Sequence, residues 1–183
     1  MTMKTTALVQ DRRLAILGIV GFSAALAAAS QVAIPLPFTP VPITLQPLLV
    51  VLAGMMLGPV FGAASMMVYL VAGAAGLPVF APLGAPGVLR FLGPTGGYLL
   101  AYPVAAYVAG LLASRTRDFS GRALAAGAGI LMLYLGGLAQ LAVLTGSLTR
   151  AALLGVAPFV ALDAVKAVVA AAVTRSPAPS RAD

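Results

Sequence analysis

Residues 123–149 read ALAAGAGILMLYLGGLAQLAVLTGSLT and contain no Asp, Glu, Lys, Arg or His. About 20 predominantly apolar residues suffice for a helix to cross the hydrocarbon core of a bilayer. Two further stretches, 14–89 and 91–114, also lack all five of these residue types. Length and hydropathy therefore predict an all-α integral membrane protein, with several membrane-spanning helices packed into one bundle.

Composition excludes several classes of protein. Of 183 residues, 61% are hydrophobic and 8% are charged, whereas a soluble domain carries roughly a quarter charged residues. Cysteine, histidine and glutamate are absent, so disulfides, thiol nucleophiles, the usual zinc sites and paired-carboxylate hydrolysis lack the residues that they need. We therefore expect no metal, no cofactor and no enzymatic activity. No GxxxxGK[ST] string is present either, so ATP-driven transport would need ATPase subunits on other chains.

Apolar runs of suitable length predict a bundle of six transmembrane helices. The predicted spans are residues 14–34, 42–57, 60–76, 97–113, 123–146 and 151–173. Leu57-Gly58-Pro59 separates the second span from the third, because glycine and proline favour a turn over a continuing helix. Since these two spans are short, a re-entrant hairpin is the alternative there.

The distribution of positive charge orients the predicted bundle. Six spans leave Arg90 and Arg150 on one side, and eight positive residues on the other: Lys4, Arg12, Arg13, Arg115, Arg117, Arg122, Arg175 and Arg181. By the positive-inside rule both termini are cytoplasmic, with residues 1–13 before the bundle, 14–173 within it and 174–183 as a disordered tail. The positive residues that give the net charge of +7 lie at the ends of the predicted spans. They do not alternate with aromatic residues on a polar face, as in a nucleic-acid-binding surface, so we expect no nucleic-acid partner.

An alternative interpretation of the first span is a secretory signal peptide, with Ala27-Ala28-Ala29-Ser30 as its small-residue cleavage site. The apolar run continues through Ile34, which is longer than a typical signal core. Removal of the first helix would also break the agreement between charge and topology. We therefore expect a retained helix.

Two connections are predicted on the outer side, at residues 35–42 and 77–97. The first holds four prolines around Phe38, which favours a stiff, extended backbone. The second contains Phe80, Arg90 and further prolines. Stiff loops on one side of a bundle can form a lid or wall of a pocket, although ordinary extracellular loops can have the same composition.

Asp163 and Lys166 are the charged residues of the last predicted span, with Asp163 near its middle. An ionised side chain in hydrocarbon costs at least about 2.5 kcal/mol, so such residues usually face a partner or a polar cavity. Three positions apart on a helix, the two share a face. A carboxylate beside an ammonium suits a small ligand with amide-like groups, but an internal ion pair and a proton relay also fit this pattern.

Other polar residues extend the candidate site. Gln31, Gln46 and Gln140 lie in or near spans, where an amide either bridges helices or meets a ligand. Gln46 is favoured because it begins the second span on the predicted outer side. Arg90 is the sole charge of the second loop, where it either receives an anionic group or is simply solvated.

The first predicted helix contains two overlapping pairs of small residues spaced four apart. They are Ala24, Ala25, Ala28 and Ala29. Such spacing permits another helix to approach closely, either from the same bundle or from a partner.

Four short strings form a further pattern. They are IPLPFTPVPITLQ at 34–46, GLPVF at 76–80, LGPTGGY at 92–98 and DAVK at 163–166. Together they resemble the BioY family, the biotin-specific substrate-binding subunits of energy-coupling-factor (ECF) vitamin transporters. The similarity covers residues 14–173.

The resemblance implies a six-helix bundle of the cytoplasmic membrane that captures biotin from outside. It also implies delivery together with a transmembrane coupling subunit and two ATPase subunits. In that family an Asp and a Lys of the last helix contact the ligand, and these match Asp163 and Lys166. An alanine motif on the first helix of related subunits contacts the coupling subunit, and the candidates here are Ala24, Ala25, Ala28 and Ala29.

The chemistry of biotin fits these residues. Its ureido group offers two N–H donors and one carbonyl, which a carboxylate and an ammonium can satisfy. We expect Asp163 to accept and Lys166 to donate, while Tyr98 and Phe80 line the bicyclic ring. Either Arg90 or Gln46 is expected to hold the valerate tail.

A self-sufficient secondary transporter is the main alternative, in which Asp163 and Lys166 relay protons. Uptake that a protonophore abolishes, and that is indifferent to ATPase subunits, would indicate this class. The sequence leaves open whether the chain works alone, as a homo-oligomer or only with its coupling module.

Overall fold

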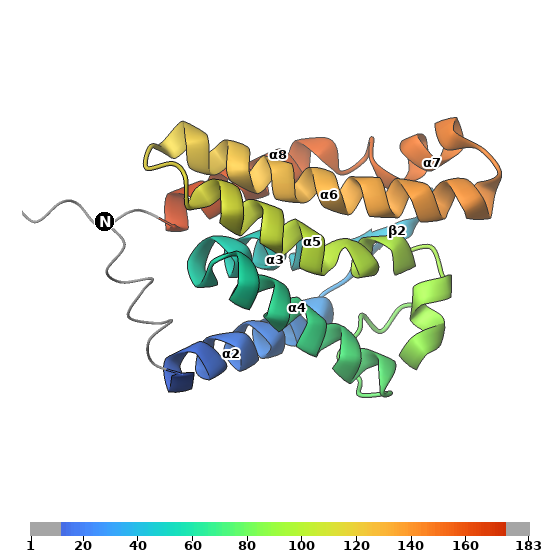
Figure 1. The fold of residues 1–183 in the computed structure, drawn as a ribbon. Coiled ribbons are helices and arrows are strands. Elements are labelled where there is room, and N and C mark those ends of the chain that lie inside the picture. Colours follow the sequence, from blue (N-terminus) through green and yellow to red (C-terminus); the bar gives the residue numbers. More distant parts are fainter. Residues whose placement is uncertain (1–11, 175–183) are drawn as a thin grey trace, which may run out of the picture.

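The computed structural model describes residues 12–174 and is mostly helical (Figure 1). The elements in chain order are α2 (Arg12–Ser30), β1 (Ile34–Leu36), β2 (Thr39–Ile43), α3 (Gln46–Leu57), α4 (Pro59–Ala74), the 3-10 helix η1 (Gly87–Leu92), α5 (Gly96–Ala113), α6 (Phe119–Thr145), α7 (Leu148–Gly155) and α8 (Val160–Val173). Helix α5 packs against α6 on one side and against α3 and α4 on the other. Helix α2 is part of this bundle, since its Leu26 is fully buried and its Ser23 hydroxyl donates to the Ser65 carbonyl of α4 at 2.6 Å.

Three of the described helices, α2, α5 and α6, are long and apolar enough to cross a membrane. Helices α7 and α8 make a fourth span if the bent pair is counted as one. Helices α3 and α4 have 12 and 16 residues, about 18 and 24 Å at 1.5 Å per residue, and Gly58 separates them with a φ of 85°. The chain is thus a membrane protein, while the count of six spans stays a prediction.

Some sequence predictions about the termini fall beyond the described residues. These are the placements of Lys4, Arg175 and Arg181 and the disorder of residues 175–183. Arg12 and Arg13, predicted to precede the first span, already lie in α2. The cytoplasmic location of both ends therefore stays a prediction as well.

The sixth predicted span is not one continuous helix. Residues 151–173 are divided between α7 and α8, whose axes differ by 55°. Pro158 lies in the break between them, and proline removes a helical N–H and clashes with the preceding turn. The prediction of one continuous last helix was therefore wrong. Asp163 lies in the first turn of α8, where the positive end of the helix dipole favours a carboxylate.

A β-hairpin in the first of the two connections predicted on the outer side also departs from the predicted all-α fold. Strands β1 and β2 pair antiparallel, with Ile34 opposite Ile43 and Leu36 opposite Thr39. The extended backbone expected for this proline-rich segment is confirmed. Strand β2 lies beside α7 (Figure 1), which places the hairpin over the break in the last predicted span.

Glycines bring the backbones of α3, α4 and α5 into direct contact. A β-carbon on Gly54 would lie 1.9 Å from the carbonyl oxygen of Ala106, and one on Gly62 would lie 2.6 Å from the α-carbon of Gly54. A β-carbon on Gly110 would lie 2.5 Å from the Gly54 carbonyl oxygen. Close approach through small residues is a main source of packing energy between membrane helices.

Gly54→Ala is expected to destabilise the protein by about 1–3 kcal/mol or more. The added methyl group would clash with backbone atoms, which cannot move aside by a change of rotamer. A lowered thermal-unfolding midpoint of the purified protein in detergent would show this. Gly127→Ala is the matched control, since nothing lies within 4 Å of a β-carbon at that position of α6. Equal midpoints for the two variants would contradict the contact.

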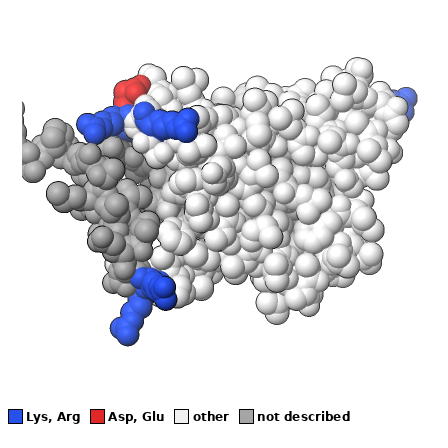
Figure 2. All heavy atoms as spheres, in the orientation of Figure 1, with Lys and Arg blue, Asp and Glu red and all other residues white. Residues whose placement is uncertain are grey.

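Charged side chains on the visible face gather at the ends of the bundle. Figure 2 shows Lys and Arg at the end where α2 begins and α5 passes into α6, a basic spot at the opposite end by α7, and no charge between. At the first end, the Asp118 carboxylate caps α6 by accepting from the Gly121 N–H at 2.8 Å. The Thr116 hydroxyl and then this N–H hold the pKa of Asp118 below its usual value. The uncharged belt between the ends is suited to lipid.

Candidate functional site

A cavity lies between α3, α4, α5, α6, α8, the hairpin and the connection from α4 to α5. Its volume is about 70 Å³, whereas one water needs roughly 10–15 Å³. It is therefore larger than a packing void. Its walls include all six ligand-binding residues predicted from the sequence, namely Gln46, Phe80, Arg90, Tyr98, Asp163 and Lys166.

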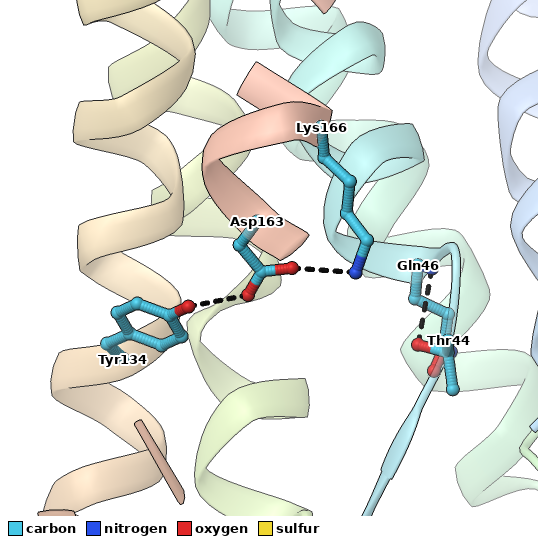
Figure 3. Close-up of polar contacts among 5 residues, drawn as sticks. All are labelled: Thr44, Gln46, Tyr134, Asp163 and Lys166. Carbon is cyan, nitrogen blue, oxygen red and sulfur yellow. Dashed lines mark hydrogen bonds and ion pairs between the residues drawn. The ribbon is translucent and has the colours of Figure 1, made fainter. Parts of the chain in front are cut away.

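An ion pair lies on the α8 side of this cavity. Lys166 Nζ donates to Asp163 Oδ1 at 2.6 Å, and the exposed fractions of the two side chains are 7% and 5%. The second carboxylate oxygen accepts from the Tyr134 hydroxyl of α6 at 2.7 Å (Figure 3). Burial of a charge is tolerated only where pairing and hydrogen bonds replace water. The carboxylate is thus held from two helices and still faces the cavity.

Tyr134 also lines the cavity, although it was not among the residues predicted from the sequence. The available signal was a tyrosine in the middle of the uncharged run 123–149, because a buried phenol usually finds a hydrogen-bond partner. Figure 3 shows its hydroxyl and the Lys166 ammonium on different sides of the Asp163 carboxylate, each bound to one of the two oxygens.

Gln46 and an aromatic cluster form the α3, α4 and α5 side of the cavity. Gln46 begins α3, is buried, and donates through Nε2 to the Tyr69 hydroxyl at 2.9 Å. The Tyr69 ring stacks on Tyr102 with centroids 6.2 Å apart and meets the edge of Phe80 at 5.5 Å. Phe80 in turn contacts Phe91 at 5.7 Å. Flat apolar walls with few polar groups are typical of small-molecule sites.

Arg90 is not a solvated loop residue. Its side chain is buried, with 6% of the residue exposed, and two of its guanidinium nitrogens donate to the carbonyl oxygens of Ala81 and Leu83. Its Nε is buried and has no hydrogen-bond partner among residues 12–174. An unsatisfied buried donor is costly, so this N–H is suited to an acceptor on a bound ligand.

The other two glutamines of the candidate set bridge helices and loops instead. Gln31 donates to the carbonyl oxygens of Pro78 and Phe80 at 3.3 Å each, and Gln140 donates to those of Phe91 and Leu92 at 3.4 and 3.3 Å. Neither is part of the cavity wall. They hold in place the loop that carries Phe80 and Arg90.

The small-residue face of α2 points away from the cavity. Ala24, Ala25 and Ala28 are exposed, and Ala29 is half-buried. The opposite face of the same helix carries the buried Ser23 and Leu26. We call the exposed alanines 24, 25 and 28 the alanine face, and it is open to an approaching helix in the described part of the chain.

Comparisons with known proteins give consistent matches over most of the chain. The BioY family model matches residues 3–182. The chain is 40% identical over 131 residues to the probable biotin transporter BioY of Pyrococcus horikoshii, which covers 72% of this chain and 76% of that protein. It is 37% identical over 150 residues to the biotin transporter BioY of Thermotoga maritima, with coverage of 82% and 87%. For the biotin transporter BioY of Rhodobacter capsulatus the identity is 40% over 186 residues, with coverage of 93% and 95%.

A solved structure shares the fold. The crystal structure at 2.1 Å of the S-component for biotin from an ECF-type ABC transporter aligns with a TM-score of 0.79 and 25% sequence identity, and 88% of each chain is covered. The match of the family model to nearly the whole sequence agrees with this structural likeness. The chain belongs to the BioY family.

Proposed function

We propose that this chain binds biotin in the cavity and serves its uptake as the substrate-specific subunit of an ECF-type transporter in the cytoplasmic membrane. The observation that carries the proposal is the Asp163–Lys166 pair, buried against a cavity that all the predicted ligand residues share. The names of the relatives and of the similar solved structure support biotin as the ligand.

The polar groups of the cavity suggest how the ligand lies. The ureido N–H groups donate to Asp163, and the ureido carbonyl accepts from Lys166. Tyr98 and Phe80 pack against the bicyclic ring. The unpartnered Nε favours Arg90 over Gln46 for the valerate carboxylate, because an arginine donor and an anionic acceptor form a strong hydrogen bond. Gln46, which lines the same cavity as Asp163 and Lys166, then belongs to the ureido end.

Transport by this subunit requires other chains in our proposal. A coupling subunit docks on the alanine face of α2, and two ATPase subunits supply the energy, since the sequence holds no P-loop. The chain itself catalyses no reaction. We further propose six membrane crossings with both termini cytoplasmic, in which the shorter α3 and α4 cross with the help of the loops beyond their ends.

Equilibrium binding of labelled biotin to the purified chain in lipid nanodiscs tests the ligand. Saturable one-to-one binding that unlabelled biotin displaces is the expected result, and a folded chain that binds no biotin would refute biotin as the ligand.

Uptake into proteoliposomes tests the class of transporter. Dependence on the coupling and ATPase subunits supports the proposal, whereas uptake without them that a protonophore abolishes indicates a secondary transporter.

Arg90→Ala is expected to weaken biotin binding by about tenfold or more, because a hydrogen bond to a charged group contributes about 1.5–3 kcal/mol. Biotin amide lacks the negative charge, so its affinity is expected to fall much less. The ratio of the two affinities distinguishes loss of a carboxylate contact from a disturbed loop, because a disturbed loop would weaken the binding of both ligands equally.

Arg150→Ala is the matched control for this measurement. Arg150 is an exposed arginine of α7 that does not line the cavity, so its removal changes the net charge equally. If Arg90→Ala leaves the ratio between biotin and biotin amide unchanged, the carboxylate role of Arg90 is wrong.

A further inference from the structure

The break between α7 and α8 frees two backbone carbonyl groups. In a continuous helix the Leu154 carbonyl would accept from the N–H of residue 158, but Pro158 has none. The Gly155 carbonyl would accept from Phe159, whose N–H instead donates to Val156 at 2.9 Å. Broken helices are tolerated in membrane proteins where other groups satisfy the freed backbone.

Side chains from two distant elements bind these two carbonyl oxygens. The Thr39 hydroxyl of β2 donates to the Leu154 oxygen at 2.6 Å, and the Tyr98 hydroxyl of α5 donates to the Gly155 oxygen at 2.5 Å. Thr39 is buried, and its hydroxyl oxygen also accepts the N–H of Val41 at 3.2 Å. The break is therefore fastened to the hairpin on one side and to α5 on the other.

Glycines make room for the tyrosine of this arrangement. A β-carbon on Gly137 would lie 2.0 Å from the Tyr98 ring, and one on Gly155 would lie 2.4 Å from its hydroxyl oxygen. The ring is thus held between α6 and the end of α7, and its hydroxyl is already engaged by backbone. Tyr98 can contribute a flat wall to the cavity while its hydroxyl fixes the break.

The break also sets the position of Asp163. Its N–H donates to the carbonyl of Phe159 at 2.8 Å, so the first turn of α8 starts from the last residue of the break. A shift at residues 156–159 would be passed to the carboxylate through this turn. Thr39 itself does not line the cavity, so any effect that it has on a ligand must pass through other residues.

We propose, on the basis of the biotin-binding function above, that Thr39 and Tyr98 are positioning residues that fix the Asp163 carboxylate toward the ligand's N–H groups. They do so by binding the carbonyl oxygens freed at Pro158. The hairpin is then part of the specificity for a ureido ligand, although its threonine touches no ligand.

Thr39→Val tests the proposal, because it keeps the shape of the side chain and removes the hydroxyl. Biotin affinity is expected to fall by up to about tenfold, the range of one hydrogen bond. Thr39→Ser retains the hydroxyl and is expected to bind within about twofold of the parent. Tyr98→Phe, which keeps the ring on the cavity wall, is expected to act like Thr39→Val.

A biotin analogue methylated on a ureido nitrogen distinguishes positioning from general stability. It cannot make the full set of bonds to Asp163, so Thr39→Val is expected to reduce its affinity less than that of biotin. Thr174→Val is the matched control, since that hydroxyl donates to the Ala170 carbonyl at 2.7 Å at the other end of α8. Equal losses for both ligands, or no loss for either, would overturn the proposal.

Hydrogen exchange of the unliganded chain tests whether the hydroxyls of Thr39 and Tyr98 hold the break between α7 and α8 in place. Thr39→Val and Tyr98→Phe are expected to speed amide exchange in residues 153–163, and Thr39→Ser is not. Unchanged exchange in the first two variants would overturn the proposal even if the parent binds biotin. A parent that binds no biotin would refute the proposed function instead, and the exchange result would still decide whether these hydroxyls hold the break.

Discussion

Asp163→Asn and Lys166→Met are each expected to weaken biotin binding by about a hundredfold. A hydrogen bond to a charged group contributes about 1.5–3 kcal/mol, and each substitution also leaves its former partner as an uncompensated buried charge. In the parent the two groups are 2.6 Å apart and nearly inaccessible, so solvent cannot replace either. Equilibrium binding of labelled biotin in nanodiscs measures the loss.

The variant with both substitutions separates binding from folding. Each single change is expected to lower the thermal-unfolding midpoint, because breaking one side of a buried pair is strongly destabilising. Removal of both charges is expected to recover much of that stability, but to leave biotin bound as weakly as in the single variants. If the double variant binds biotin like the parent, the pair only locks α8 in place and is not a ligand contact.

Ala24→Leu and Ala28→Leu are expected to reduce biotin uptake to the background level while biotin affinity changes less than about twofold. Small residues let a partner helix approach to backbone distance, and a leucine on either position would hold it away. Both alanines are exposed on α2, and neither lines the cavity. Co-purification with the coupling subunit and uptake into proteoliposomes provide the two readouts.

Ala172→Leu is the matched control for the alanine face. Ala172 is exposed near the end of α8, so the same change is made on a surface that we expect to face lipid. Normal uptake by the variants at positions 24 and 28 would contradict docking on this face. So would an equal loss of uptake in the control, because the effect would then not depend on α2.

The sequence predicted the elements whose signals are local. Uncharged runs located the long helices, Gly58 and Pro59 marked the turn between α3 and α4, and clustered prolines indicated the extended first loop. The charged pair was found because ions are rare in apolar helices. The resemblance then pointed to Phe80 and Tyr98, and the cavity brings these four residues together, although their contacts with biotin stay predictions.

Long-range contacts were beyond what the sequence indicated. Pro158 was visible in the sequence, but the run 151–173 is apolar enough to be read as one span, so the break was missed. Thr39 lies 115 residues before the carbonyl that it binds, and Tyr134 lies 29 residues before Asp163. Neither pairing follows from periodicity, because each depends on how separate helices are packed.

The glycine contacts among α3, α4 and α5 have a consequence for how the molecule can change shape. At these contacts backbone packs directly against backbone, so no side chain can change rotamer to accommodate a shift of one helix against another. The three helices therefore have one packed arrangement. These three helices should therefore move as one rigid body. Any change of shape that admits or releases a ligand must then be taken up outside these three helices.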